Sequence, residues 1–117
     1  MQLKSEYQHV DAAAPIVVTF GGSPQMRHHV VSRLAATGKL TVYGTLSEEE
    51  GLDRLRTLSR VDVVVIGSRY TEAQRRRIKE YVAQHLPGTL TSEPGREYPY
   101  DEEEMIRDIG QKLGWQP

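Results

Sequence analysis

Residues 61–67 have the sequence VDVVVIG, a short run rich in β-branched residues that ends at a glycine. A continuous apolar run of this length is typical of a strand covered on both faces, as in a parallel sheet. Residues 15–22, PIVVTFGG, have the same character and also end in glycine. The two runs predict neighbouring interior strands, with residues 63–66 at the centre of the sheet.

Two further strands are predicted on either side of this pair, at residues 40–46 and 89–91. The second of them is short and more polar, which suits a sheet edge. Between the strands, apolar residues recur at helical spacing. Each helix begins with a capping residue, because a Ser, Thr or Asp precedes it at Ser23, Ser47, Thr71 and Asp101.

Strands that alternate with helices predict right-handed βαβ units and helices on both faces of a sheet. The expected fold class is α/β, a three-layer sandwich with a four-stranded parallel sheet in the flavodoxin-like order 2-1-3-4. A Rossmann half with the order 3-2-1-4 is the alternative. Residues 15–117 are expected to form a single α/β domain, and residues 1–14 either a flexible tail or an added arm.

Composition excludes several function classes. Lys and Arg total 15 and Asp and Glu total 16, so a net charge of -1 gives no bulk attraction to nucleic acid or an anionic membrane. The chain has no cysteine, which excludes disulfides and thiolate chemistry. Residues 1–14 lack the apolar core of a signal peptide, so a cytoplasmic location is expected, with neither nucleic acid nor a membrane as partner.

Two motifs, a run of three arginines and a pair of histidines, are interpreted as parts of the surface and not as binding sites. Arg75, Arg76 and Arg77 are expected to form a solvated basic face of one helix, because nearby acids offset their charge. His28 and His29 are adjacent, and adjacent residues on a helix point about 100° apart and cannot chelate one ion together. No metal site is therefore predicted.

The helix that begins at Ser23 differs from the other three, because its first turn contains no acidic residue. Two glycines precede it, so an anion could approach the backbone N–H groups at the positive end of the helix. The alternative is that the glycines only make a tight turn. The predicted anion site at the carboxyl edge of the sheet comprises Gly21, Gly22, Ser23, Arg27, Gly67, Ser68 and Arg69.

Known nucleotide fingerprints are missing from this turn. The chain has neither a complete GxGxxG motif nor a Gly-Lys-Ser/Thr sequence, so no cofactor is predicted. The loop 93–100, EPGREYPY, lies at the same edge and carries Arg96, Tyr98 and Tyr100. These side chains could stack on a ring or form a protein interface. Alternatively, the tyrosines pack the last helix against the sheet.

The order and length of the elements from residue 15 to residue 113 resemble the flavodoxin-like group, and within it the receiver domains of response regulators. Receivers have an acidic pair after the first strand, where this chain has Gly21 and Gly22, and a phosphoacceptor Asp after the third, where it has Gly67 and Ser68. The resemblance implies a degenerate receiver that cannot accept a phosphoryl group by that mechanism.

Two functions follow as alternatives. The residues favour a non-catalytic binding or interaction module over an enzyme, because no GxSxG motif or paired catalytic groups are present. The alternative is a small phosphate- or nucleotide-binding domain that uses the glycine turn, either by itself or as part of an enzyme. Apolar residues without obvious intrachain partners predict a homodimer, or an unidentified protein partner, through Leu90, Tyr98, Tyr100 and Trp115.

Overall fold

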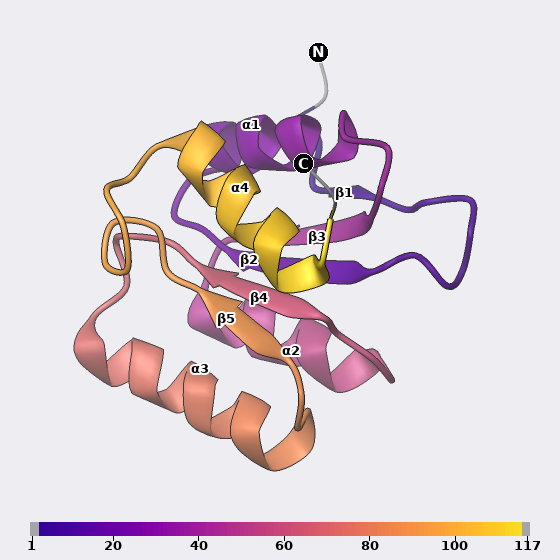
Figure 1. Cartoon of the computed structure of the whole chain (residues 1–117). Helices are drawn as coiled ribbons and strands as arrows, with labels where there is room; N and C mark the ends of the chain where they lie inside the picture. Colours follow the sequence, from indigo (N-terminus) through magenta and orange to yellow (C-terminus); the bar gives the residue numbers. More distant parts are fainter. Residues whose placement is uncertain (1–2, 116–117) are drawn as a thin grey trace.

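The computed structural model describes residues 3–115 as five strands and four helices (Figure 1). The elements in chain order are β1 Glu6–Tyr7, β2 Ile16–Phe20, α1 Pro24–Ala35, β3 Thr41–Thr45, α2 Glu48–Thr57, β4 Val63–Ile66, α3 Glu72–His85, β5 Leu90–Ser92 and α4 Glu102–Leu113. The first two residues of the expected arm and the last two of the expected domain lie outside the described residues.

The predicted fold class is wrong in one respect, because the sheet has five strands and is mixed. Its order is β1-β3-β2-β4-β5. The strands β3, β2, β4 and β5 are parallel and follow the expected order, whereas β1 pairs antiparallel with β3. With this extra strand, β2 is the middle of the sheet and β4 lies beside it.

The additional strand is short, and its pairing depends on contacts distant in sequence. Glu6 is paired with Tyr43, and Tyr7 with Val42. On either side of this pair, the Gly44 N–H donates to the Ser5 carbonyl at 2.7 Å and the His9 N–H donates to the Thr41 hydroxyl at 2.9 Å. Residues 5–9 therefore form an arm that lies along the outer edge of β3.

The helices form two layers around the sheet (Figure 1). Residues of α1 and α4 pack on one face with the alternate strand residues Val17, Val63 and Val65. Residues of α2 and α3 pack on the other face with Val18, Phe20, Val64 and Ile66. Because β2 continues through α1 to β3 on one side and the chain then crosses to β4 on the other, the winding reverses between β2 and β4.

The expected caps are present at all four helices. The Ser23 side chain accepts from the Met26 N–H at 3.2 Å, with Pro24 at the first helical position. Thr71 and Gln74 form a complete capping box. At α2 only half of a capping box forms: the Ser47 side chain accepts from the Glu50 N–H, but the Glu50 side chain accepts from the Leu46 N–H instead of the N–H of Ser47. No helix within residues 3–115 has the length and hydropathy needed to cross a membrane.

A candidate ligand pocket at the carboxyl edge of the sheet

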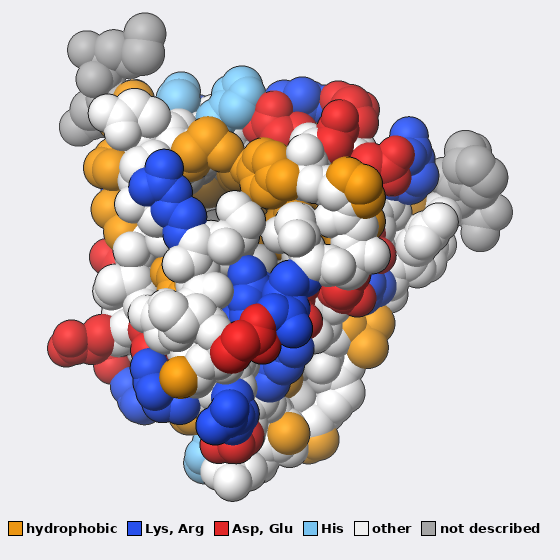
Figure 2. Space-filling model, turned by 90° about the vertical axis from the view of Figure 1, so that its left-hand side faces the viewer, with side chains coloured by type: hydrophobic (Ala, Val, Ile, Leu, Met, Phe, Trp, Pro, Cys, Tyr) orange, Lys and Arg blue, Asp and Glu red, His pale blue; other side chains and the backbone are white. Residues whose placement is uncertain are grey.

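A pocket of about 260 Å³ opens at the carboxyl ends of β2 and β4, where the winding of the chain reverses. Ligands of open α/β sheets bind at such positions. Figure 2 faces this edge of the molecule and shows a hollow bordered by hydrophobic side chains. The lining comes from the ends of β2 and β4, from the β2–α1, β4–α3 and β5–α4 loops and from α1 and α4: Thr19, Phe20, Gly21, Gly22, Ser23, Met26, Arg27, Val30, Val65, Gly67, Ser68, Arg69, Tyr70, Pro94, Tyr100 and Met105.

The structure brings together the seven residues that the sequence singles out for an anion site. They all line this pocket, and Tyr100 of the loop 93–100, called the rim loop below, lines it with them. Arg96 and Tyr98 do not belong to the lining. The proximity of the seven is a geometric result, and their binding of an anion stays a prediction.

The amides of the β2–α1 turn are not equally available to a ligand. The Gly21 N–H donates to the Thr45 carbonyl at 2.9 Å, and the Met26 N–H donates to the side chain of the capping residue Ser23. Within the described part of the chain, the N–H groups of Gly22, Ser23 and Gln25 have no protein acceptor. Three donors therefore remain for a ligand at the start of α1.

Gly67 has a structural role that the sequence does not reveal. Its N–H donates to the Phe20 carbonyl at 2.9 Å, and its own carbonyl accepts from Arg75 at 2.9 Å. A Cβ at this position would lie 2.9 Å from the Phe20 carbonyl oxygen, which is closer than real contacts allow. Glycine is therefore required here for the close approach of two strand ends, and its amide is not free for a ligand.

Two arginines line the pocket without an acidic partner among the described residues. Arg69 is exposed, and its side chain lies against Gly22, because a Cβ there would be 3.1 Å from the Arg69 Cδ. Arg27 extends over Gly44, with its Nε buried and without a hydrogen-bond partner. A buried donor without an acceptor costs free energy. The lining thus presents two uncompensated positive charges.

The rest of the lining is largely apolar, and sequence reasoning missed most of it. Val31 and Leu34 of α1 are buried in the core, whereas Met26 and Val30, nearer the start of the same helix, line the pocket. Tyr70 packs edge-on against Phe20 and donates its hydroxyl to the Gly21 carbonyl at 2.9 Å. Burial, helped by the charges of Glu50 and Glu48, raises the pKa of Tyr70 to about 12. Tyr70 therefore stays neutral and holds the turn.

The expected solvated face of α3 is wrong for Arg75, which is only 3% exposed. Its guanidinium donates to the Tyr70 carbonyl at 3.1 Å, the Gly67 carbonyl at 2.9 Å and the Glu93 carboxylate at 2.8 Å. Lys79 completes the cluster at 2.6 Å from the other Glu93 oxygen. Arg75 thus fastens the β4–α3 loop to the start of the β5–α4 loop, and both loops line the pocket.

Acid should weaken this fastening. Burial alone would raise the pKa of Glu93, but hydrogen bonds and charges from Lys79 and Arg75 outweigh it and hold the pKa below its ordinary value of 4.5. A carboxylate with a lowered pKa contributes stability that is complete above the unfolded-state pKa and is lost as the pH falls through the folded-state pKa. Above about pH 5, wild type should be more stable than Glu93→Gln, and this difference should shrink towards about pH 3. Urea unfolding of both proteins across this range measures it, and a pH-independent difference would contradict the assignment.

The other residues of the rim loop serve packing and surface ion pairs. The Tyr98 hydroxyl shares a hydrogen bond of 2.6 Å with Ser92, which donates to Asp108 of α4 at 2.7 Å. Burial raises the pKa of Tyr98 to about 12. Arg96 forms ion pairs with Glu72 and Glu93. Tyr98 therefore packs the last helix against the sheet, which was one of the two alternatives for the tyrosines, whereas Tyr100 lies at the pocket.

The histidines and the expected interface residues lie away from the pocket. His28 accepts the Lys4 N–H at 2.7 Å, and His29 lies 2.9 Å from Glu102. Within residues 3–115 no three His, Asp or Glu side chains are grouped as a metal site would need. Trp115 packs on Gly110 and under the Lys39 ammonium, so it has intrachain partners after all. Self-association through Leu90 and Tyr100 stays a prediction.

The fold and the pocket define a three-layer α/β domain with an open cavity at the reversal point of its sheet. Comparison of the chain with protein-family models, with curated proteins and with solved structures found no match. The resemblance to receiver domains therefore stays a prediction, and the function has to be argued from the pocket itself.

Proposed function

We propose that this chain is a non-catalytic binding module that holds a small anionic molecule in the pocket at the carboxyl edge of the sheet, here called the rim pocket. The observation that carries the proposal is the combination of Arg27 and Arg69, which have no acidic partner within residues 3–115, in a lining that contains neither Asp nor Glu. Guanidinium groups and free backbone N–H groups at a helix N-terminus are donors that bind carboxylates and phosphates.

The chemistry of the lining favours binding over catalysis. Among its residues there is no His, Lys, Asp or Glu that could act as a general base. The hydroxyl of Ser23 caps α1 and that of Tyr70 is committed to Gly21. The lining contains no base that could activate the Ser68 hydroxyl as a nucleophile. A bound molecule is therefore expected to be released from the pocket without a chemical change.

Removing the exposed arginine should weaken anion binding. For Arg69→Ala we expect the affinity for inorganic phosphate to fall by about 1–3 kcal/mol, the scale of a hydrogen bond to a charged group. Arg76→Ala is the matched control, because Arg76 is an exposed arginine on α3 outside the pocket. Calorimetric titration of the three proteins tests this. Equal losses in both variants would mean that only net charge matters, and undetectable binding to wild type at millimolar phosphate would overturn the proposal.

A side chain at Gly22 should also abolish binding while preserving the fold. In Gly22→Val the three atoms nearest to the new Cβ all belong to the flexible Arg69 side chain, which can move aside. Its methyl groups would cover the free amides of the turn and displace Arg69. Thermal unfolding close to that of wild type, together with loss of phosphate binding, is the expected result. Unchanged phosphate affinity would show that the anion does not approach this turn.

A further inference from the structure

We infer that the molecule bound in the pocket carries one apolar ring beside its anionic group, so that the ligand class is a small aromatic anion. This inference rests on the proposed function, because the ring is placed relative to the anion site at Arg27 and Arg69. Its support comes from the uncharged side chains that line the rest of the pocket.

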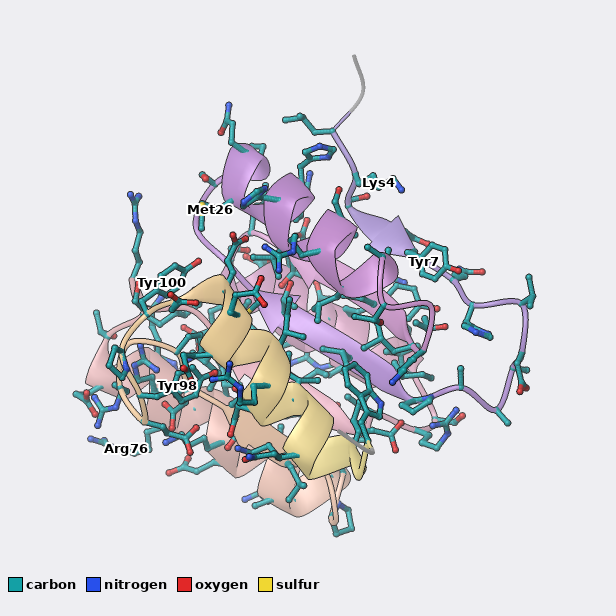
Figure 3. The ribbon with its side chains drawn as sticks, turned by 45° about the horizontal axis from the view of Figure 1, so that its top comes forward. Lys4, Tyr7, Met26, Arg76, Tyr98 and Tyr100 are labelled. Carbon is teal, nitrogen blue, oxygen red and sulfur yellow. The ribbon has the colours of Figure 1, made fainter. Side chains whose placement is uncertain are left out.

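The mouth of the pocket is flanked by two large apolar side chains that the fold leaves exposed. Met26 is 40% exposed and Tyr100 is 44% exposed. They come from different elements, α1 and the β5–α4 loop, and Figure 3 shows both at the same end of the molecule. Both line the cavity. A flexible thioether and an aromatic ring are both groups that make favourable contacts with a flat ring.

The floor of the pocket is apolar as well. Phe20, Val65 and Met105 line it, and each is almost fully buried in the cores on the two faces of the sheet. A ring that enters between Met26 and Tyr100 would therefore leave water for an apolar surface, which is the main source of affinity for such groups. Inorganic phosphate has no part that could use this surface.

The size of the cavity limits the ligand. Its volume of about 260 Å³ lies just below the range of roughly 300–1,000 Å³ that is usual for drug-sized ligands. One six-membered ring with one anionic group fits this size, whereas a dinucleotide does not. The Tyr100 phenol stays neutral beside such a ligand, because burial and the nearby Glu102 charge raise its pKa.

Phenyl phosphate is the probe that tests this inference, with inorganic phosphate as its reference. Both are titrated into wild type, Tyr100→Ala, Met26→Ala and Leu90→Ala, and the affinities are measured by calorimetry or NMR. Leu90 is the matched control, because it is also 44% exposed but lies on the edge strand β5 outside the pocket. We expect phenyl phosphate to bind wild type roughly ten-fold more tightly than phosphate. Tyr100→Ala and Met26→Ala should remove most of this advantage, and Leu90→Ala should keep it.

The outcomes separate the inference from the proposed function. If phosphate binds but the phenyl group adds nothing, the aromatic class is wrong and the anion site stands. If the phenyl group adds affinity that Tyr100→Ala and Met26→Ala retain, the ring lies elsewhere and the inference is overturned. If neither probe binds at millimolar concentration, the proposed function fails, and the inference fails with it.

Discussion

Replacing Val65 with Asp is expected to lower the free energy of unfolding by about 4–5 kcal/mol. Val65 is 3% exposed and lies opposite Thr19 of β2 and Ser92 of β5, so strands flank it on both sides. Its side chain packs with Val17 and Met105 in the core beneath α1 and α4. A carboxylate there would lose the apolar contacts and bury a charge without a partner.

Urea unfolding measures this effect, with Leu90→Asp as the control. Leu90 is also a strand residue, but it lies on the edge strand and is 44% exposed, so its replacement should change stability by only about 0.5 kcal/mol. Similar losses in the two variants would show that β4 is not an interior strand and would remove the floor of the pocket.

Replacing Arg75 with Met is expected to destabilise the protein by about 3 kcal/mol, because Glu93 would lose one of its two close cationic partners inside the protein. The carbonyls of Gly67 and Tyr70 would also lose their donors. The β4–α3 loop would then be less well fixed, so phosphate affinity should fall as well, although Arg75 is not one of the pocket-lining residues.

Arg77→Met provides the matched control on the same helix. Arg77 also pairs with a glutamate, Glu48, but its side chain is exposed, and exposed pairs contribute about 0–1 kcal/mol. Its removal should leave phosphate affinity unchanged. If Arg75→Met costs no more stability than Arg77→Met, the buried cluster does not hold the loops.

The parallel part of the fold could be predicted because its signals are local. Runs such as residues 61–67 and caps such as Ser23 determine a strand or a helix start within a few residues. The strand β1 has no such signal, since two residues cannot show a period. Its formation depends on the free edge of β3, 34 or more residues away in the chain, which only the folded sheet presents.

The place of the pocket could be predicted as well, because the reversal point follows from the strand order. The state of each group could not. The sequence predicts Gly67 as part of the anion site, whereas its contact with the Phe20 carbonyl gives it a structural role. The run of three arginines suggests that Arg75 is solvated like its neighbours. Arg75 nevertheless lies three residues before Ile78 and seven before Val82, on the buried face of α3. Periodicity applied to charged residues would have found it.

The most direct test of the anion site is a titration of the isotope-labelled chain with inorganic phosphate, followed by NMR of backbone amides and arginine Nε–H groups. The amides of Gly22, Ser23 and Gln25 and the Nε–H of Arg27 have no protein acceptor in the described residues, so their signals should shift most. The Gly21 amide, bonded to Thr45, should shift less. If these signals do not move at millimolar phosphate, or if the largest shifts lie on α3 around Arg76, the rim pocket is not an anion site.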